Sequence, residues 1–408
     1  GRGRNGRPPR HGDEGSMPPM SGKQQPRCIL QVLPRLEMGG VEQGTLDVAH
    51  AIARRGDVAL VASAGGSMAL ELPGLGAEHV PMPLHSKTPW GILRNARGLA
   101  ELIRGRGIDL VHARSRAPAW AAYRAARETG VPFVTTFHGT YNFRSELKRR
   151  YNAVMAKGDR VIAISDFIGW HLRAHYGADG DVIRVVPRGT DLLRFDPANI
   201  HHERWIALAA RWCLPDGVPV VLMPARLTRW KGHMVLMDAL ARLQRPEVRC
   251  LFVGSDQDDG SYRRELERAA VRRGLADRVS VRDDCTDLPA AYMLADVVVS
   301  ASTEPEAFGR VATEAQAMGV PLVATEHGGV PEQVLPGETA YLAAPGDAAD
   351  LANGLEWALS LDTDARERLA EHGRTRARTF ATEAMCAGVL AVYDELLAPQ
   401  GDAGSRAA

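Results

Sequence analysis

Two glutamates flank a glycine just after an apolar, strand-like segment in the second half of the chain. The segment Val297–Ser300 is followed by Glu306, Gly309 and Glu314, and a helix is predicted to begin between the two carboxylates. The free backbone N–H groups at a helix start bind phosphate, whereas carboxylates beside them suit hydroxyl groups, such as those of a sugar or a ribose. The alternative is that Glu306 complements the helix dipole and Glu314 is a solvated helix residue.

Two cationic side chains follow another strand-like segment. Arg226 and Lys231 come after Val220–Met223 and precede a predicted helix. A guanidinium fork and a mobile ammonium group at one strand end suit a diphosphate. The alternative is that Arg229 and Lys231 are surface charges flanking Trp230, and that only Arg226 is held in place. Cations and carboxylates together predict a site for a ligand that carries both phosphates and hydroxyls.

These residues belong to a chain in which predicted strands and helices alternate. Apolar runs predicted as strands lie at 28–33, 58–62, 110–111, 133–137, 161–164 and 182–186, and again at 220–223, 250–253, 279–281, 297–300 and 322–324. Strands separated by helices of roughly 10–15 residues are typical of parallel sheets with helices on both faces. Two such series predict an α/β protein with two doubly wound domains and a ligand cleft at the carboxyl ends of the strands.

The pattern also predicts where the domains begin and end. The first domain is expected over 27–198 and the second over 199–381, because the alternation pauses near 195–198. The segment 382–398 is expected to be a helix that packs back across the domain junction. Residues 1–26, rich in Gly, Pro and Arg, and residues 399–408 are expected to be disordered tails.

Composition excludes several classes of protein. The 408 residues are 45% hydrophobic and 24% charged, as in an ordinary soluble protein,. No apolar run approaches the ~20 residues that a membrane-spanning helix needs. Five cysteines are scattered without paired spacing, which indicates neither a disulfide framework nor a zinc site and favours a reducing cytoplasm,. Aromatic residues make up only 6% and no recognition module is visible, so nucleic-acid binding is not expected,.

The net charge of +1 conceals an asymmetry between the two halves. Residues 1–200 hold 28 basic and 18 acidic side chains, and residues 201–408 hold 22 and 31. A basic half suits an anionic partner such as a phosphate-bearing glycolipid or a membrane surface. The alternative is that the asymmetry in charge reflects random drift in the composition of the protein surface.

Several motifs in sequence order are typical of one enzyme family. They are MGGVE at 38–42, DLVHARS at 109–115, TFHG at 136–139, VPRGTD at 186–191, the Arg226–Lys231 and Glu306–Glu314 segments, and EHGGVPE at 326–332. Over residues 28–397 the chain resembles the retaining glycosyltransferases of family 4. That resemblance implies the GT-B fold: two Rossmann-like domains with an interdomain cleft, the first binding the acceptor and the second the nucleotide-sugar donor.

The resemblance implies a role for each catalytic candidate. Arg226 and Lys231 would hold the donor diphosphate and stabilise it as the leaving group. Glu306 would contact hydroxyls of the transferred sugar, and Glu314 those of the ribose. His138 would reach the donor sugar near the scissile bond; the alternative is a strand-end histidine whose ring is hydrogen-bonded to the backbone.

It also implies roles for residues that line the donor and acceptor sites. Gly39 and Gly40 would let the chain approach the diphosphate. Phe308, Gly309, Arg310 and Val311 would line the sugar and phosphate site, and Asp283 and Thr286 would lie beside the base. From their position alone, Arg114 and Arg116 are either arginines at the rim of the cleft or acceptor-binding residues that contact an anionic acceptor. One departure stands out: the family usually has glycine before the phosphate-binding arginine, where this chain has Ala225.

The expected reaction is hexosyl transfer from a nucleotide-diphosphate sugar to a hydroxyl of a glycan or glycolipid, of the lipopolysaccharide or cell-envelope type, with retention. No cofactor or metal is expected. A metal-dependent alternative is Asp256-Gln257-Asp258, which could pass for a cation-binding Asp-x-Asp. Two other functions stay open, a GT-B-like nucleotide-sugar epimerase and a non-catalytic glycan-binding or scaffold protein. The expected location is the cytoplasm, peripheral on the inner membrane.

Overall fold

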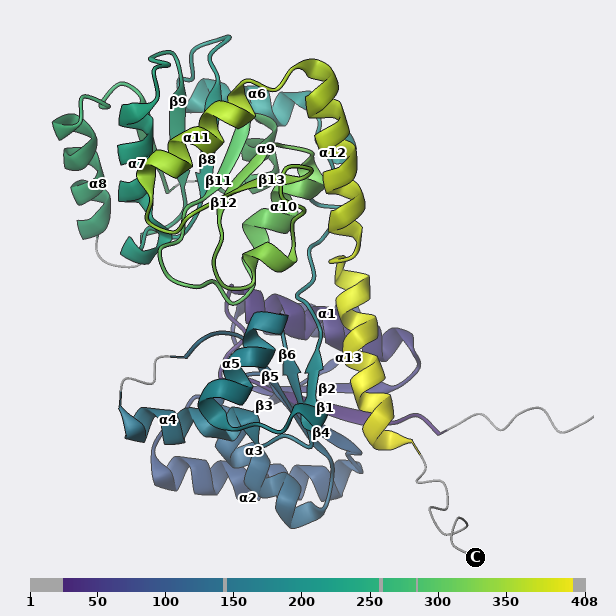
Figure 1. Cartoon of the computed structure of the whole chain (residues 1–408). Coiled ribbons are helices and arrows are strands. Elements are labelled where there is room, and N and C mark those ends of the chain that lie inside the picture. Colours follow the sequence, from purple (N-terminus) through teal and green to yellow (C-terminus); the bar gives the residue numbers. More distant parts are fainter. Residues whose placement is uncertain (1–24, 142–144, 257–259, 284, 399–408) are drawn as a thin grey trace, which may run out of the picture.

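The computed structural model of the chain has two α/β domains, one above the other in Figure 1. It describes residues 25–141, 145–256, 260–283 and 285–398, and the structural statements below concern these residues. The segments 1–24 and 399–408, expected to be tails, lie outside them. Each domain is built on one parallel sheet, so the fold class predicted from the alternation of strands and helices is confirmed.

The N-terminal domain contains a seven-stranded sheet in the order β3-β2-β1-β4-β5-β6-β7. Its strands are β1 (Cys28–Val32), β2 (Val58–Ser63), β3 (Glu78–Pro81), β4 (Leu110–Ala113), β5 (Phe133–Phe137), β6 (Arg160–Ala163) and β7 (Ile183–Val185). Its helices are α1 (Gly40–Arg54), α2 (Pro89–Arg106), α3 (Arg116–Thr129), α4 (Glu146–Asn152) and α5 (Asp166–Tyr176), with short 3₁₀ helices η1 (Ser67–Leu75), η2 (Ala153–Ala156) and η3 (Gly180–Val182).

The C-terminal domain contains a six-stranded sheet in the order β10-β9-β8-β11-β12-β13. Its strands are β8 (Val220–Pro224), β9 (Arg249–Val253), β10 (Val279–Arg282), β11 (Val297–Ser300), β12 (Leu322–Thr325) and β13 (Ala340–Ala343). The helices from the junction onward are α6 (His202–Arg211), α7 (His233–Arg242), α8 (Ser261–Arg272), α9 (Leu288–Met293), α10 (Arg310–Met318), α11 (Ala348–Leu359), α12 (Thr363–Arg378) and α13 (Thr382–Leu397), with η4 (Pro197–Asn199), η5 (Arg229–Lys231) and η6 (Val330–Glu332).

The strands form where the sequence has short apolar runs because both faces of each sheet are covered. Every residue of β1, β4, β5, β8 and β11 is buried, as parallel sheets between helical layers require. Helix boundaries also follow local chemistry. Thr88 caps α2 by accepting a hydrogen bond from the backbone N–H of Gly91, and Ser165 caps α5 by accepting one from Ile168,.

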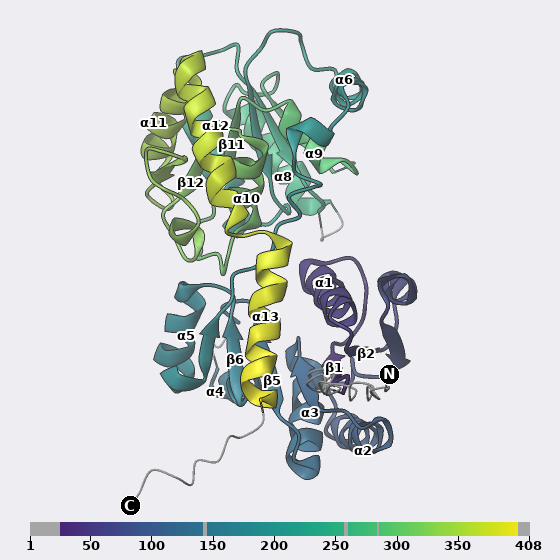
Figure 2. The same ribbon diagram turned by 90° about the vertical axis from the view of Figure 1, so that its right-hand side faces the viewer.

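Helix α13 leaves the C-terminal domain and packs on the N-terminal domain (Figures 1 and 2). Val389, Val392 and Tyr393 join the same buried cluster as Ile29 in β1 and Leu46 in α1. The buried hydroxyl of Tyr393 lies 2.6 Å from Nδ1 of His112, whose Nε2 lies 2.7 Å from Thr136 Oγ1. These contacts tie the end of the chain to strands β4 and β5.

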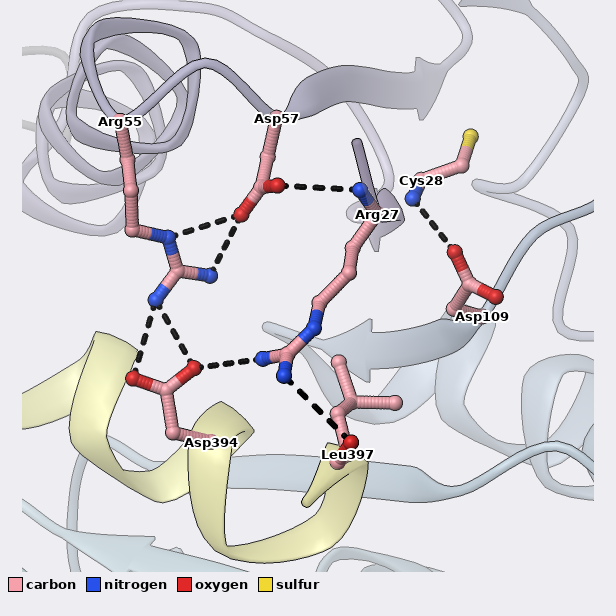
Figure 3. A network of polar contacts seen from close by, with 7 residues as sticks. All are labelled: Arg27, Cys28, Arg55, Asp57, Asp109, Asp394 and Leu397. Carbon is pink, nitrogen blue, oxygen red and sulfur yellow. Dashed lines mark hydrogen bonds and ion pairs between the residues drawn. The ribbon is translucent and has the colours of Figure 1, made fainter. Parts of the chain in front are cut away.

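A polar network near the end of α13 connects it to the start of β1 (Figure 3). The Asp394 carboxylate accepts hydrogen bonds from Arg27 at 2.7 Å and from Arg55 at 3.0 Å. Arg27 also donates its backbone N–H to Asp57, which pairs with Arg55. Exposed pairs of this kind contribute little free energy each, so the network mainly fixes the register of α13, while its apolar face supplies the stability.

The two domains meet where α10 and the loops of the upper domain face α1 and α5 of the lower domain (Figure 1). The Ser165 hydroxyl donates a hydrogen bond of 2.6 Å to the carbonyl of Ala307. The Glu332 carboxylate accepts two bonds of 2.7 Å from the backbone N–H groups of Asp166 and Phe167. Glu332 therefore complements the N-terminus of α5 from the other domain. No helix in the described ranges has the length and apolar character needed to cross a bilayer.

Candidate functional site

A partly buried ion pair joins the two strand-end loops that carry the predicted chemistry. Nζ of Lys231 lies 2.6 Å from Oε1 of Glu306, and the two side chains are only 13% and 12% exposed. Ser302 donates a second hydrogen bond, of 2.5 Å, to the same carboxylate oxygen. The ammonium group also lies 4.3 Å from the centre of the Trp230 ring. The structure thus brings together a cation and a carboxylate that are 75 residues apart in the sequence.

Glycines make this close approach of the two loops possible. Gly232 has a φ of +84°, and a Cβ atom there would collide with the carbonyl oxygen of Ala301. The backbone N–H of Thr303 donates to the carbonyl of Trp230 at 2.7 Å. Gly328, at φ +66°, lies against the backbone of Glu306, so the loop after β12 supports the carboxylate from the other side. A larger residue at either glycine would displace one half of the ion pair.

Arg226 lies at the end of β8 with its side chain exposed and without a hydrogen bond or ion pair to any described residue. It is therefore available to a ligand at the same edge of the sheet as Lys231. The preceding Ala225, where the family has glycine, packs against the core of the C-terminal domain. The backbone of the loop after β9 packs closely against Ala225 at Gly254, where a Cβ atom would collide with the carbonyl of Ala225.

Helix α10 begins directly after the Glu306 loop. Gly309 precedes it at φ +92°, so Arg310 and Val311 occupy the first turn, where backbone N–H groups lack partners within the helix,. The Phe308 side chain turns away into the domain junction. It is 4% exposed, joins the core of the N-terminal domain and lies 5.8 Å from the Phe380 ring. Phe308 can therefore line the site through its backbone only.

Glu314 is buried one turn inside α10 and is not the solvated residue of the alternative interpretation. Its side chain is 6% exposed, and Oε2 accepts a hydrogen bond of 2.9 Å from the hydroxyl of the fully buried Tyr292. Burial raises the pKa of Glu314, and the nearby Arg310 guanidinium partly opposes that shift. A carboxylate held at this energetic cost is typical of a functional position.

Replacing Glu314 with glutamine should stabilise the protein. Because the folded-state pKa is raised, the charged form lowers the free energy of unfolding at neutral pH, and this penalty disappears as the pH falls and the carboxylate is protonated. Glutamine keeps an acceptor for Tyr292 without the charge. We expect the free energy of unfolding at pH 7.5 to rise by about 1 kcal/mol. Urea denaturation at pH 7.5 and at lower pH measures it, with Glu304→Gln at an exposed position as control. A less stable variant at pH 7.5 would contradict the argument.

His138 lies at the end of β5 in a pocket at the domain junction. Gly40 from α1, Arg114 from the end of β4, and Arg310 from α10 line the same pocket. Both ring nitrogens of His138 are buried and have no hydrogen-bond partner in the described chain. Burial holds the pKa of His138 well below its usual range, and the guanidinium groups of Arg188 and Arg114 lower it further. The imidazole is therefore neutral and has one donor and one acceptor to offer.

Gly39 and Gly40 occupy the turn between β1 and α1. Gly39 has an extended backbone and precedes the first helical residue. A Cβ atom at Gly40 would lie 2.7 Å from Nη2 of Arg188, so glycine allows the guanidinium to pack against the start of the helix. The helix N-terminus and this arginine thus face the cleft together.

The two arginines predicted to bind the acceptor line different pockets. Arg114 lies in the junction pocket beside His138. Arg116 lines a more open hollow with Lys87 and Lys148, donates to Asn152 Oδ1 at 2.9 Å, and lies 4.2 Å from the centre of the Tyr141 ring.

Asp283 and Thr286, predicted to lie near the base, are exposed in the loop after β10. The Asp283 carboxylate forms an ion pair of 2.5 Å with Arg263 of α8. Asp287, next to Thr286, caps α9 and pairs with Arg204. Neither predicted residue contacts the Lys231–Glu306 pair.

In the proposed metal motif, Asp256 accepts a hydrogen bond from the backbone N–H of Arg263. Gln257 and Asp258 lie outside the described residues.

Two residues of the site were not singled out by sequence reasoning. Ser302 belongs to the Glu306 loop, but nothing in its spacing indicates that its hydroxyl contacts the carboxylate. Arg188 lies after β7 in the VPRGTD motif and lines the junction pocket. Its position after a strand, next to the predicted cleft, is the sequence feature that could have identified it.

Comparison with known families matches most of the chain to two models. The model described as Glycosyltransferase Family 4 matches residues 38–194, and the model described as Glycosyl transferases group 1 matches residues 208–376. The two matches fall on the N-terminal and C-terminal domains respectively.

Curated relatives carry one recurring name. D-inositol 3-phosphate glycosyltransferase of Xylanimonas cellulosilytica is 33% identical over 88% of this chain and 92% of that protein. The protein of the same name from Salinispora arenicola is also 33% identical, over 83% of this chain and 79% of its own length.

Solved structures agree over the whole described fold. A glycosyltransferase from Rickettsia africae has a TM-score of 0.85 and 37% identity, covering 92% of this chain and all of its own. Anabaena HepE, solved in complex with UDP and glucose, has a TM-score of 0.77 and 25% identity, covering 91% of this chain and all of its own.

Proposed function

Because this chain belongs to the family 4, group 1 glycosyltransferases, we propose that it transfers a hexosyl group from a nucleotide-diphosphate sugar to a hydroxyl, with retention of anomeric configuration and without a metal ion. The observation that carries the proposal is the Lys231–Glu306 pair beside the start of α10. It places a cation, a carboxylate and free backbone N–H groups at one edge of the donor domain.

The donor diphosphate would bind between Arg226, Lys231 and the first turn of α10. The exposed Arg226 and the backbone N–H groups of Arg310 and Val311 have the chemistry to bind phosphate oxygens. On donor binding, Lys231 would share its charge between the leaving phosphate and Glu306. Glu306 would then accept hydrogen bonds from sugar hydroxyls, and Glu314 from the ribose. UDP is the first nucleotide to test because HepE was solved with UDP and glucose.

In the proposed reaction the bond from C1 of the sugar to the phosphate oxygen breaks as the bond from C1 to the acceptor oxygen forms on the same face. The proton of the acceptor hydroxyl moves to the departing phosphate oxygen. Charge therefore develops on the diphosphate, where Arg226, Lys231 and the start of α10 would stabilise it. These groups supply the positive charge that a metal ion supplies in other transferases. Neutral His138 would hold a hydroxyl of the donor sugar and would transfer no proton.

We propose a phosphate-bearing acceptor bound in the hollow lined by Arg116, Lys87 and Lys148. Two lysines and an arginine around one opening suit a phosphate group. The curated relatives are named for D-inositol 3-phosphate, which carries such a group. The expectation of a lipopolysaccharide-type acceptor keeps the same chemistry, because a phosphorylated glycan or glycolipid offers the phosphate as well.

Peripheral association with an anionic membrane surface remains part of the proposal. The first 200 residues carry the excess of basic side chains. Arg149, Arg150 and Arg173 line a common hollow near the exposed Leu147 and Trp170. Cationic and apolar side chains on one face suit the surface of an anionic leaflet, where a lipid-linked acceptor would be presented.

Transfer in the presence of a chelator tests the proposal. We expect the full chain to release nucleoside diphosphate from a UDP-hexose when inositol phosphate is added, and to keep its full rate in excess EDTA, because protein cations stabilise the leaving group. Liquid chromatography of the nucleotide and mass spectrometry of the glycosylated product measure both results. A rate that EDTA abolishes and Mg²⁺ or Mn²⁺ restores would contradict metal independence. An isomerised nucleotide sugar without transfer would indicate an epimerase.

A further inference from the structure

Three arginines converge on the junction pocket described above, between α1, α13 and the carboxyl ends of the N-terminal strands. Arg114 and Arg188 come from the N-terminal domain, and Arg310 comes from the start of α10 in the other domain. Helix α10 faces α1 at this place (Figures 1 and 2). The pocket therefore receives positive charge from both domains.

These guanidinium groups have no partner for their charge. Arg114 is 3% exposed, and its Nε is buried without a hydrogen-bond partner. Arg188 and Arg310 form no hydrogen bond or ion pair through their side chains with any described residue. Burial lowers the pKa of Arg188 to about 10, and Arg310 and Arg114 contribute to the shift. Arg114 is buried, Arg188 is half-buried and Arg310 is exposed. Because an unpaired charge away from water is costly, Arg114 and Arg188 require an anion that the described chain does not supply, and Arg310 can add its charge from the other domain.

The nearby acidic groups do not cancel this charge. Asp47 lines the pocket but forms no ion pair with Arg114; its carboxylate accepts a hydrogen bond from Gln43, and burial raises its pKa. Glu42 and Glu314 lie near Arg188 and Arg310 respectively, and neither forms an ion pair with them. Three guanidinium groups therefore face one lining carboxylate.

The side chains of the pocket differ from those of the proposed diphosphate site, although Gly40 and Arg310 border both sites. Arg226, Lys231, Glu306 and Glu314 are absent from its lining, which instead includes His138 with both ring nitrogens unpartnered. Since the diphosphate already has its own cations at the edge of the donor sheet, the charge in the junction pocket is available for another group.

We infer that the junction pocket binds a second oxyanion of the substrates, a carboxylate or phosphoryl group distinct from the donor diphosphate. Arg188 and Arg114 would bind it from the N-terminal domain, and Arg310 would close on it from the donor domain. The group is carried either by the transferred sugar, as in a uronic acid, or by the acceptor, in which case the acceptor phosphate binds in the junction pocket and not in the hollow lined by Arg116. The inference rests on the proposed function and narrows it to an enzyme that selects an acidic substrate.

Paired probes identify the source of the oxyanion. Binding of UDP-glucuronic acid is compared with that of UDP-glucose in the donor arm, and binding of inositol phosphate with that of inositol in the acceptor arm. The full chain is compared with Arg188→Gln, the conservative Arg188→Lys, and Arg310→Gln. Arg310 is exposed, so this last variant should fold even if changes at Arg188 do not. Arg124→Gln, at an exposed arginine of α3 outside the pocket, is the matched control.

We expect the wild-type chain to prefer the acidic probe in one arm by about tenfold or more, the worth of one charge-assisted contact. Arg188→Gln and Arg310→Gln should remove that preference, Arg188→Lys should keep part of it, and the affinity of the Arg188→Gln chain for UDP alone should change less than about twofold. If the variants lose the preference for UDP-glucuronic acid, the oxyanion belongs to the transferred sugar. If they lose the preference for inositol phosphate, it belongs to the acceptor. The inference is overturned if neither arm shows a preference that depends on Arg188, or if Arg188→Gln weakens UDP binding as much as Arg226→Ala does.

A further titration separates this inference from the proposed function. Inorganic phosphate is added without nucleotide to the Arg226→Ala chain, in which the diphosphate site is weakened. We expect it to raise the unfolding temperature, and to do so much less when Arg188→Gln is combined with Arg226→Ala. An equal rise of the unfolding temperature in the single and the double variant would contradict binding of phosphate in the junction pocket. A wild-type chain that binds no UDP and releases none from any donor would instead overturn the proposed function, whatever the phosphate result.

Discussion

Replacing Glu306 with glutamine is expected to lower kcat by about two to three orders of magnitude, in the range found for removing one group that stabilises a transition state. Glutamine has the size of glutamate and keeps an oxygen for the hydroxyl of Ser302. It loses the negative charge that holds Lys231 at 2.6 Å and that would bind the hydroxyls of the transferred sugar. The ammonium group would then lack its partner, and the sugar its anchor near the reacting carbon.

Initial rates of nucleoside diphosphate release at saturating donor measure this effect. Glu304→Gln is the matched control, because Glu304 lies in the same loop with an exposed side chain. Donor affinity should fall much less than kcat in Glu306→Gln, since the nucleotide keeps Arg226 and the start of α10. Turnover equal to that of the control would remove Glu306 from the reaction.

Replacing Arg226 with alanine should weaken nucleoside diphosphate binding by about 2–3 kcal/mol, or roughly 30- to 150-fold, as expected for a charge-assisted contact. The side chain is exposed and forms no contact that holds the fold together, so the variant should fold normally. Affinity for the monophosphate should fall less, because UMP has one phosphate fewer for the guanidinium to bind.

Titration calorimetry with UDP and UMP measures the two affinities. Arg229→Ala is the control, since Arg229 lies in the same loop but pairs with Glu265 on the surface. If Arg229→Ala lowers the affinity for UDP as much as Arg226→Ala does, the loss reflects general electrostatics, and the prediction of a specific contact between Arg226 and the diphosphate is wrong.

The sequence predicted the strands that lie inside the two sheets because they are buried on both faces and read as continuous apolar runs. The strands β3 and β13 were not predicted. Both are edge strands, Glu78–Pro81 and Ala340–Ala343, and they contain at most one β-branched residue each. The other two edge strands, β7 and β10, were predicted because each contains two valine or isoleucine residues,. Helix starts are predictable where a hydroxyl caps them, as at Thr88 and Ser165, because this chemistry is local.

The residues of the site could be predicted from the sequence, but the contacts that they form could not. Strand-end positions placed Glu306, Lys231 and Arg226 at one edge of a sheet, because parallel strands end together. Spacing could not show that Lys231 and Glu306 pair in the absence of ligand, since loop conformation decides that. Nor could it show that Phe308 turns into the domain junction, because its partners there come from the other domain and from the end of the chain.

Neighbouring residues can also serve different pockets. Arg114 and Arg116 are two positions apart at the end of β4, yet the first is buried beneath α1 and the second faces the hollow near α4. An extended segment turns alternate side chains to opposite faces, but Arg116 is already the first residue of α3, so the change to helix separates them. Only the three-dimensional structure could show this.

The configuration of the product at its new glycosidic bond tests the central claim most directly. The proposed cleft binds the leaving diphosphate and the incoming hydroxyl on the same face of the sugar, so an α-configured nucleotide sugar should yield an α-glycoside. Proton NMR of the product formed by the full chain, recorded early in the reaction, distinguishes the two anomers by the coupling of the anomeric proton. An α-linked product is the predicted result, and a β-linked product would contradict the account.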